Sequence, residues 1–560
     1  MKNIIIAQSV SELKFLLKKV PKISNLFCLP LNLPIQLYCI EKKIPFINPI
    51  LYINKRFHKE AIFSSEKMVK KIKFDKSYKF SEKINVVTFL RFYFNSIIFL
   101  IEIINQINKK EKINQIFVSG WFNYKDTFST ENYYISFILK KLFRKKIVEV
   151  DKQNIRLPKF NYKIKYLIKT KKLTENSKII ILSNLGYNFF RILKYLFKRK
   201  EKFLVFSPFN SEISIFKKII FKILRIQFFS FEMIRSNEKF SFKLPKVQYK
   251  FRKFDITKLL NFRIHQEKNN ILKNKLKFDC FDKFFFDIKP FLVITNNSRN
   301  LDGLILDFAY KKAIPFFCIP HGTISAYFNK FDKIYKKIIA ESITYPNSIF
   351  ISQSKISRWF FNKEKNFYKK NILSGNILFA EKSRTASKGN SILYAVTMKD
   401  FKSIQFLGVE MYYEYLDNLY ILNKLSEKNN LRIIVKNHPA IRNLTKKMQL
   451  IFKNLIFSDK KIQTLLNDAF CTVSFSSSVI EDSLHFKKPV ILLDRWNRYK
   501  HCKIFKIKNS KNPVIQYATD EKKFINCIET LYKNKKTNFG YYTKPENSKS
   551  NIANLLDKFV

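Results

Sequence analysis

The stretch that most constrains the fold runs from residue 431 to residue 494, because it alternates apolar segments with polar turns and a short helical segment. The segments 431–436, 470–475 and 489–493 are apolar runs of strand length. Strands that are joined through helices pair in parallel, so this stretch predicts a parallel α/β sheet. In such sheets ligands bind outside the carboxyl ends of the strands.

Two polar clusters follow directly after two of these strands. His438 follows the first, and Pro439 disfavours helix at the preceding residue, so we expect an extended backbone that presents the imidazole at the strand end. Three serines follow the second strand and open a helix, whose free N–H groups and positive dipole end suit a phosphate. The two clusters together predict one pocket for the phosphates of a nucleotide.

Structural interpretations of the same residues stay open. Ser478 and Glu481 have the spacing of a capping box, in which the two side chains satisfy the first N–H groups of a helix and bind no ligand. A cap alone does not require three serines. His438 could equally be a loop histidine with a structural partner, although its position after a buried strand favours function.

A second histidine has the same kind of position. The segment 314–320 is a predicted strand, and it leads into His321, Gly322 and Thr323. The glycine lets backbone approach a ligand closely. A neighbouring predicted strand, 290–295, precedes a polar segment that holds Asn297, Arg299 and Asp302. Asp302 could instead cap the helix that follows.

The composition permits several partners. With 560 residues the chain can form two or more domains, and its net charge of +63 is typical of proteins that bind nucleic acids or anionic membranes. However, the lysines are scattered along the whole chain and accompany only 8 glycines, which indicates an AT-biased genome, so we expect no nucleic-acid partner. The 7 dispersed cysteines contain no C-x-x-C pair, which favours reduced thiols in a cytoplasmic protein.

The sequence predicts a soluble or peripheral protein. The first apolar run is too short for a signal peptide, and the longest later run, 92–107, is interrupted by Glu102. Between residues 134 and 234, basic residues alternate with apolar clusters. Such segments either pack as helices against a core or lie on an anionic bilayer, so peripheral contact with the inner face of the plasma membrane stays an alternative.

The motifs resemble a known group of enzymes. VKNHP (435–439) and the following SSSVIEDSLHFKKPVILL (476–493) are similar to the donor-binding half of GT-B glycosyltransferases, in particular the capsule and surface-polysaccharide group and the CDP-glycerol glycerophosphotransferases. IPHGTI (319–324) resembles the element that ends the amino-terminal domain of these families. Asp302-Gly303 is similar to the acidic-glycine motif of bacterial sialyltransferases, including the polysialyltransferase type. The similarity spans residues 290–494.

The resemblance implies an α/β fold of the GT-B type, in which two Rossmann-like domains face each other across a cleft. We expect an acceptor-side domain with helical insertions at residues 1–340 and a nucleotide-sugar-binding domain at residues 341–560. Alignment on the K-P-V-I strand places Asp482 on the acidic position of the motif, with Glu481 one residue early. The expected donor-binding residues are Lys436, Ser476, Ser477, Ser478, Glu481, Asp482, Gly375 and Thr397.

The implied reaction transfers a sugar from a nucleotide-sugar to a surface glycan or its lipid-linked precursor. His321 is the expected general base, and His438 is expected to neutralise the departing phosphate. The expected acceptor-side residues are Gly322, Thr323, Asn297, Arg299 and Asp302. No D-x-D element lies at a strand end, so we expect neither a metal nor another cofactor. A glycerophosphotransferase, a sugar-nucleotide epimerase and a non-catalytic binding protein for polysaccharide or nucleic acid remain alternatives.

Overall fold

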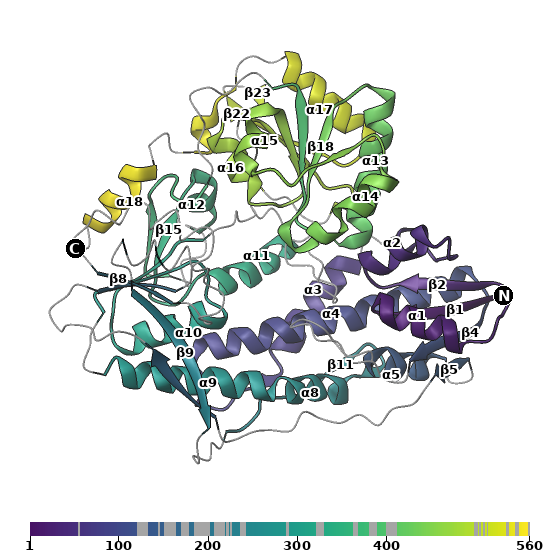
Figure 1. Cartoon of the computed structure of the whole chain (residues 1–560), viewed down its shortest axis with the longest axis horizontal. Helices are drawn as coiled ribbons and strands as arrows, with labels where there is room; N and C mark the ends of the chain where they lie inside the picture. The colour runs from purple at the N-terminus through teal and green to yellow at the C-terminus, as the bar shows by residue number, and fades with distance from the viewer. Residues whose placement is uncertain are drawn as a thin grey trace.

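The fold is built on three parallel sheets flanked by helices (Figure 1). The computed structural model describes residues 1–53, 57–119, 133–143, 146–150, 164–169, 179–183, 202–206, 219, 223, 227–235, 242–286, 290–320, 330–361, 368–379, 389–398, 411–497, 502, 504, 506–507, 510–511, 513–533, 537–543 and 548–557. The sheets have four, eight and six strands among these residues, and three two-stranded ladders accompany them. The predicted α/β class is therefore confirmed.

The amino-terminal sheet has the strand order β2-β1-β4-β5, and all its strands run parallel. Its elements are β1 (Lys2–Ala7), α1 (Val10–Lys19), β2 (Leu26–Pro30), α2 (Leu33–Glu41), β4 (Ile113–Ser119), α5 (Tyr133–Leu142) and β5 (Ile147–Val150). Ser9 and Asn32 begin the first two helices by accepting backbone N–H groups with their side chains. This sheet is separate from the eight-stranded one, so the first 340 residues contain two sheets and not a single one.

A long helix, α4 (Phe80–Lys110), connects the amino-terminal sheet with the eight-stranded sheet. Its length and composition would allow it to cross a membrane, but 83% of its most apolar window is buried inside the protein. A helix that is apolar on nearly all sides lies in a core. It packs beside α3 (Phe57–Val69), α8 (Thr257–Gln266) and α10 (Asn300–Lys311).

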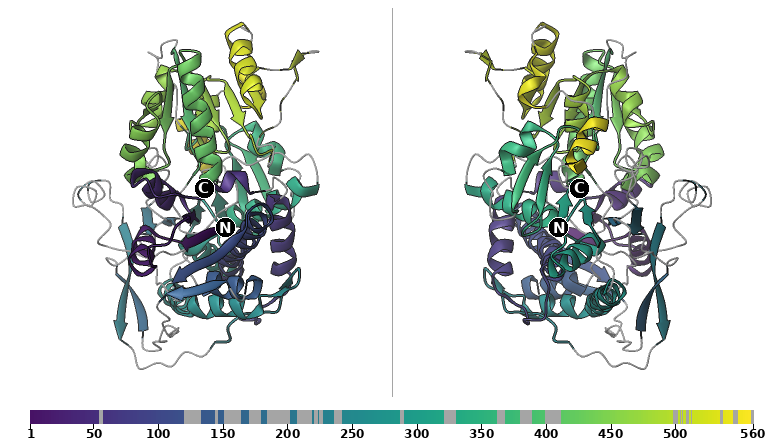
Figure 2. Two further views of the ribbon diagram at one scale, coloured as in Figure 1. Left: turned by 90° about the vertical axis from the view of Figure 1, so that its right-hand side faces the viewer. Right: turned by 90° about the vertical axis from the view of Figure 1, so that its left-hand side faces the viewer.

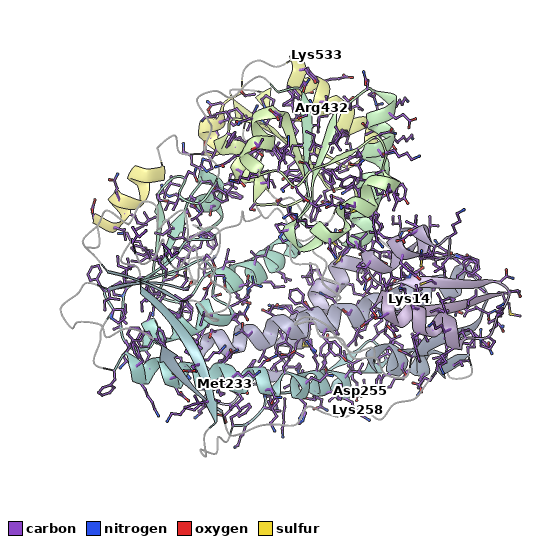
Figure 3. The ribbon with its side chains drawn as sticks, in the orientation of Figure 1. Lys14, Met233, Asp255, Lys258, Arg432 and Lys533 are labelled. Atoms are coloured by element: carbon purple, nitrogen blue, oxygen red, sulfur yellow. The ribbon has the colours of Figure 1, made fainter. Side chains whose placement is uncertain are left out.

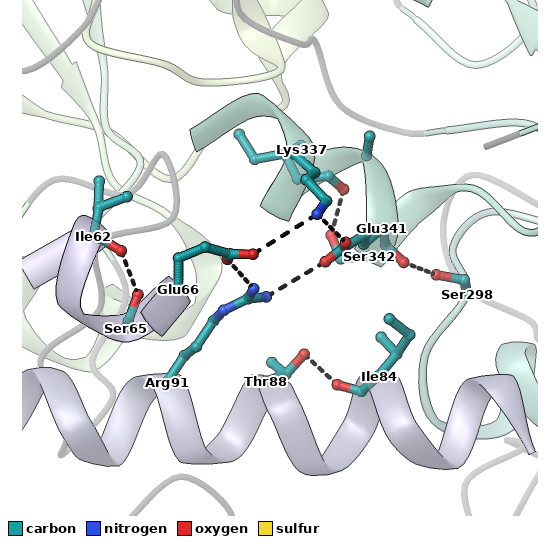
Figure 4. A network of polar contacts seen from close by, with 12 residues as sticks. Ile62, Ser65, Glu66, Ile84, Thr88, Arg91, Ser298, Lys337, Glu341 and Ser342 are labelled. Carbon is teal, nitrogen blue, oxygen red and sulfur yellow. Dashed lines mark hydrogen bonds and ion pairs between the residues drawn. The ribbon is translucent and has the colours of Figure 1, made fainter. Parts of the chain in front are cut away.

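A buried ion network fixes α4 to its neighbours (Figure 4). The guanidinium of Arg91 contacts Glu66 of α3 at 2.7 Å and Glu341 of α11 (Lys330–Ile343) at 3.7 Å. Lys337 lies 3.8 Å from both carboxylates. The backbone carbonyl of Glu341 also accepts a hydrogen bond from Ser298 Oγ at 2.8 Å. The network therefore joins the helical core to the loop that follows β13.

The eight-stranded sheet has the order β16-β15-β14-β13-β7-β8-β9-β6, and only β6 runs antiparallel to its neighbour. Its strands are β6 (Ile164–Lys169), β7 (Ile179–Leu182), β8 (Lys202–Phe206), β9 (Gln227–Arg235), β13 (Leu292–Thr295), β14 (Phe316–Cys318), β15 (Ile349–Ser352) and β16 (Lys370–Leu373). Helices α9 (Lys268–Phe284), α10, α11 and α12 (Lys355–Phe361) accompany it. Part of the basic segment proposed for membrane contact is β9, which is paired on both sides.

The carboxy-terminal sheet has the order β19-β18-β17-β20-β21-β24, and every pair is parallel. Its strands are β17 (Ser391–Ala395), β18 (Ile433–Lys436), β19 (Ile456–Phe457), β20 (Ala469–Ser474), β21 (Val490–Leu493) and β24 (Ile515–Ala518). Its helices are α13 (Tyr412–Lys428), α14 (Thr445–Ile451), α15 (Ile462–Asp468), α16 (Val479–His485) and α17 (Glu521–Lys533). The three strands predicted between residues 431 and 494 are confirmed.

The division between the sheets does not coincide with the predicted boundary after residue 340. β15 and β16 pair with β14, so residues 349–373 belong to the eight-stranded sheet, and the next sheet starts at Ser391. Apolar strands read the same in either sheet, so the sequence pattern could not assign them. The domain limits themselves stay a prediction.

The carboxy-terminal unit, green to yellow, lies above the rest of the chain in every view (Figure 2). It packs on the amino-terminal sheet through one continuous core, and the Tyr412 hydroxyl donates to the carbonyl of Pro30. It meets the eight-stranded unit where Lys355 N donates to the carbonyl of Tyr542 at 2.9 Å. Two α/β units with largely parallel sheets therefore meet here, and the amino-terminal sheet lies beside them as a third. The last helix, α18 (Ser548–Asp557), follows this contact.

Candidate functional site

The carboxyl ends of three neighbouring strands form the candidate site. β17 lies between β18 and β20, and Ala395 is in register with Lys436 on one side and Ser474 on the other. The chain continues from β17 to β18 and β19 at one edge, then returns to β20 on the opposite side of β17. The order therefore reverses between β17 and β20, which is the place where open α/β sheets bind their ligands. Thr397 follows β17 at this point and is largely buried.

His438 has the extended backbone that Pro439 predicted, with φ −62° and ψ 140°. It caps a short 3-10 helix (Pro439–Leu444), because its Nδ1 accepts the N–H of Ala440 at 3.1 Å. A neutral imidazole that accepts at Nδ1 carries its proton at Nε2. Nε2 is therefore the nitrogen that can donate to an anion, and the structural and the functional interpretation of His438 are compatible.

A cavity of about 750 Å³ adjoins His438 on the 3-10 helix side. Its lining residues are Pro439, Ala440, Arg442, Asn443, Thr445, Lys446 and Asp459. Arg442 and Asp459 form an ion pair at 3.1 Å. Burial lowers the pKa of nearby Lys436, an effect that Asp459 opposes and Arg442 strengthens. Among the described lining residues, the basic Arg442 and Lys446 thus outnumber the carboxylate of Asp459.

The serine turn after β20 is organised by its own hydroxyls. Ser474 Oγ donates to the carbonyl of Ala395 at 3.0 Å and accepts the N–H of Ser477 at 3.1 Å. Ser477 Oγ in turn accepts the N–H of Val479 at 3.3 Å. Ser478 stands at the N-cap of α16, but its side chain makes no capping bond. The capping-box interpretation of Ser478 and Glu481 is therefore wrong.

Glu481 joins the two larger sheets. Its carboxylate is buried and accepts a hydrogen bond from the hydroxyl of Ser354, which follows β15. The same hydroxyl accepts the N–H of Ser357 at 3.1 Å, so it also begins α12. One oxygen of Glu481 is thus occupied by a structural contact. The neighbouring Asp482, also largely buried, becomes the better candidate for the acidic position of the motif.

The residues after β13 hydrogen-bond to one another. Asn297 Oδ1 accepts the N–H of Arg299 at 2.8 Å, and Asn297 Nδ2 donates to the carboxylate of Asp302. Arg299 precedes α10, and burial lowers its pKa while Asp302 opposes the shift. Asp302 lies within the first turn of the helix, so it does not occupy the N-cap position.

Gly303 explains why the acidic residue is followed by glycine here. A Cβ at this position would lie 2.4 Å from the carbonyl oxygen of Ser298 and 2.5 Å from Cβ of Ser81. The glycine therefore permits close packing of α10 against α4. The Asp-Gly pair has a packing role, whichever ligand the loop binds.

Gly375 lies apart from the other expected donor-binding residues. It follows β16, so it belongs to the eight-stranded sheet and not to the sheet that carries Lys436 and Thr397. Its φ of 87° is in the left-handed region that glycine adopts most readily. The next residues lead back toward the carboxy-terminal unit, where Phe379 stacks on His485 of α16.

Sequence reasoning missed Gln353, which is buried and connects three strand-end loops. Its Nε2 donates to the carbonyl of Pro320 at 2.6 Å, after β14. Its Oε1 accepts the N–H groups of Ile377 at 3.1 Å and Leu378 at 2.7 Å, after β16. His321, Gly322 and Thr323 lie outside the described residues, but the carbonyl immediately before His321 is held by this amide. Only its place after strand 349–352 could have drawn attention to Gln353.

Metal ligation has no candidate in the part of the chain that the structure describes, since no group of three or more His, Cys, Asp or Glu residues lies close enough to hold an ion. The pair Asp279 and Asp282, which has the wrong spacing for a metal motif, lies in α9, where Asp282 contacts Lys311 at 2.6 Å. Burial raises the pKa of Asp279.

No family model matches the chain, and no curated protein matches it. Solved structures similar to it include UDP-GlcNAc 2-epimerase from Methanocaldococcus jannaschii (15% identity, 68% of this chain and 99% of that one, TM-score 0.36) and from Neisseria meningitidis (10%, 68% and 99%, 0.39). The wall teichoic acid polymerase TagF is another (12%, 68% and 88%, 0.36). Similarities at these TM-scores carry no inference about substrate or reaction.

Proposed function

We propose that the chain is a GT-B transferase that moves a sugar from a nucleotide-sugar to a surface polysaccharide, of a capsule or a lipopolysaccharide, or to its lipid-linked precursor. The observation that carries the proposal is the meeting of three strand ends at the reversal point of the carboxy-terminal sheet. Thr397, His438 and the serine turn follow these three strands. Basic, hydroxyl and imidazole groups at one strand-end crevice suit a nucleotide diphosphate.

The donor phosphates would be bound by the groups around β18 and β20. His438 Nε2 and the ammonium of Lys436 would neutralise the charge that develops as the nucleotide departs. The hydroxyls of Ser476 and Ser478 would hold the same phosphates, and Ser477 would keep the turn in shape through its bond to Val479. Asp482 would accept the ribose hydroxyls, because a carboxylate can accept two such bonds.

The acceptor would enter from the eight-stranded sheet. His321 would take the proton of the acceptor hydroxyl as general base, with Gly322 and Thr323 beside the reacting centre. Asn297, Arg299 and Asp302 would line the acceptor side as an internally bonded loop. We propose that the reaction needs no metal and that the enzyme acts in the cytoplasm or peripherally on the inner face of the plasma membrane.

A thermal-shift screen tests the donor site. UDP, CMP, CDP, GDP and their sugar conjugates are added to the wild type, to His438→Ala and to Lys453→Ala, an exposed lysine of the same unit that serves as control. A nucleotide at 100 times its dissociation constant stabilises the folded state by about 2.7 kcal/mol. We expect one nucleotide class to raise the Tm of the wild type and of the control but not of His438→Ala.

The alternatives are separated when CDP-glycerol is added to the screen and the UDP-sugars are assayed for conversion. Stabilisation by CDP-glycerol alone would replace the sugar donor with a glycerophosphate donor. Conversion of a bound UDP-sugar without an acceptor would indicate an epimerase. Silence from every nucleotide would contradict the proposal and leave a non-catalytic binding protein. For an active enzyme, His321→Ala should reduce the rate about 10²- to 10⁴-fold without weakening nucleotide binding.

A further inference from the structure

A second cavity, of about 770 Å³, shares none of its described lining residues with the cavity beside His438. It is bordered by β3 (Ile72–Lys73), β10 (Lys246–Val247) and α8. Its lining residues are Lys71, Lys73, Leu244, Pro245, Lys246, Val247, Gln248, Thr257, Asn261, Ile264 and His265. Lys258, in the first turn of α8, and Asp255, which lies just before that helix, are at the opposite edge of the molecule from Arg432 and Lys533 of the carboxy-terminal unit (Figure 3).

The lining of this cavity is basic. Lys71, Lys73 and Lys246 line it together with His265, and the described part of the chain contributes no aspartate or glutamate to the lining. None of the three lysines forms an ion pair with the residues that the structure describes. Burial and the nearby Lys268 lower the pKa of His265, in keeping with a positive potential at this place.

Two of these lysines face each other directly. β10 and β3 pair antiparallel, and Lys246 is in register with Lys73. Like charges at directly opposite positions of an antiparallel pair destabilise it, because their side chains lie on one face at short range. In a chain of net charge +63 many lysines are scattered over the surface, but Lys73 and Lys246 line one and the same cavity. An anion between the two ammonium groups would turn the repulsion into attraction.

The walls of the cavity are fixed before any ligand binds. Asn261 of α8 binds the backbone of β10 through two hydrogen bonds. Its Oδ1 accepts the N–H of Val247 at 3.1 Å, and its Nδ2 donates to the carbonyl of Val247 at 2.7 Å. Thr257 Oγ1 accepts the N–H of Tyr249 at 3.0 Å. The backbone that carries Lys246 is thereby attached to α8. A site that is already formed loses less entropy on binding.

We propose that this cavity is a binding site for a phosphate-bearing anion, held between Lys73 and Lys246 with Lys71 and His265 as further contacts. Lysine ammonium groups bind phosphate as point charges and adapt to its position. The cavity has the volume of a small-molecule site, large enough for a pyrophosphate or a sugar phosphate. The site is independent of the donor site around His438 and does not rest on the proposed function.

Isothermal titration calorimetry tests the proposal. It measures the binding of pyrophosphate to the full chain in a buffer without phosphate. The double variant Lys73→Gln/Lys246→Gln removes the facing charges, and Lys250→Gln/Lys258→Gln removes two charges from neighbouring positions that do not line the cavity. We expect the first variant to weaken binding at least about tenfold, and the control to change it less than about twofold.

Two measurements keep the result interpretable. Because Lys73→Gln/Lys246→Gln removes a repulsion, its Tm without ligand should equal or exceed that of the wild type, which excludes unfolding as the cause of lost binding. His438→Ala should bind pyrophosphate at this cavity as the wild type does. Equal losses in both double variants would show an effect of net charge only and would overturn the proposal, as would the absence of binding.

Vesicle flotation distinguishes whether the bound phosphate belongs to a lipid headgroup or to a soluble molecule. Vesicles of phosphatidylcholine with phosphatidylglycerol present the same chemistry as a lipid headgroup. If the wild type and the control float while Lys73→Gln/Lys246→Gln does not, the site takes a headgroup. If pyrophosphate binds and none of the proteins floats, the site takes a soluble phosphate. Failure of both probes contradicts the proposal.

Discussion

The strand order reverses in both the amino-terminal and the carboxy-terminal sheet, but different side chains occupy the two reversal points. In the first, the strand order reverses between β1 and β4, and the carboxylate of Glu12 lies there, fully buried. It accepts the N–H of Gln8 at 2.7 Å and the hydroxyl of Ser119. In the second, the reversal lies between β17 and β20, where the hydroxyl of Ser474 bonds the carbonyl of Ala395 and the N–H of Ser477, and the hydroxyl of Ser477 bonds the N–H of Val479.

The difference shows that topology alone does not make a ligand site. At β1 and β4 the protein's own carboxylate takes the donors that would otherwise bind a phosphate, so this crevice is structural. At β17 and β20 the turn is held by serine hydroxyls, and His438 accepts the N–H of Ala440 through Nδ1. The proposed nucleotide site therefore lies in the carboxy-terminal crevice.

The largest effect on stability is expected from Glu12→Ala, which removes the buried carboxylate at the reversal point of the amino-terminal sheet. Two buried donors would lose their acceptor, at a cost of about 3 kcal/mol in the free energy of unfolding. Urea denaturation measures it, with the exposed Lys18→Ala of the same helix as control. Nucleotide binding by the folded fraction should not change. An unaltered urea midpoint would contradict the structural assignment of this crevice.

The raised pKa of Asp307 predicts that the free energy of unfolding depends on pH, with an effect of similar size. Burial raises the pKa of its carboxyl to about 6, although Ser81 and Tyr345 donate hydrogen bonds to it. The folded state thus binds this proton more tightly than the unfolded state, so the contribution to stability is complete below about pH 4 and is lost as the pH rises through 6, by about 3 kcal/mol. Urea denaturation of wild type and Asp307→Asn between pH 4 and pH 8 should show a flatter decline in the variant. Parallel curves would contradict the assignment.

The variant Gln353→Glu tests whether the eight-stranded sheet and the carboxy-terminal sheet have separate roles in the reaction. The carboxylate would still accept the N–H groups of Ile377 and Leu378 but would lose the bond to Pro320 and repel its carbonyl. We expect kcat to fall about tenfold to a hundredfold through displacement of the His321 loop, with nucleotide affinity unchanged. Equilibrium binding and steady-state rates are compared in the same preparation. A loss of nucleotide affinity with unchanged kcat would place Gln353 in the donor site instead.

The smallest effect is expected from Asp459→Asn. Its ion pair with Arg442 is half-exposed, so stability should change by less than about 0.5 kcal/mol. The substitution removes the carboxylate that the described residues contribute to the cavity beside His438, and the stronger positive potential should tighten nucleotide binding about twofold to fivefold. Titration calorimetry measures the change, and weaker binding would indicate that Asp459 itself contacts the ligand.

The sequence predicted the local features of the site because they depend on neighbouring residues. Pro439 determines the backbone of His438, and the apolar runs mark β17, β18, β20 and β21. The remaining features depend on partners distant in sequence. Glu12 meets Ser119, and Glu481 meets Ser354, across more than 100 residues each. Sequence periodicity does not reveal contacts between distant residues. For the same reason we did not predict the role of Gln353, and we expected Gly375 in the carboxy-terminal sheet although it follows a strand of the eight-stranded sheet.

The most direct test of the central claim is equilibrium binding of the stabilising nucleotide to the wild type, His438→Ala and Glu12→Gln. Glu12→Gln keeps an acceptor in the amino-terminal crevice, so it serves as the matched variant of the other reversal point. The account predicts that His438→Ala weakens binding about a hundredfold while Glu12→Gln binds as the wild type does. Full affinity in His438→Ala together with a loss in Glu12→Gln would contradict it and move the nucleotide site to the amino-terminal sheet.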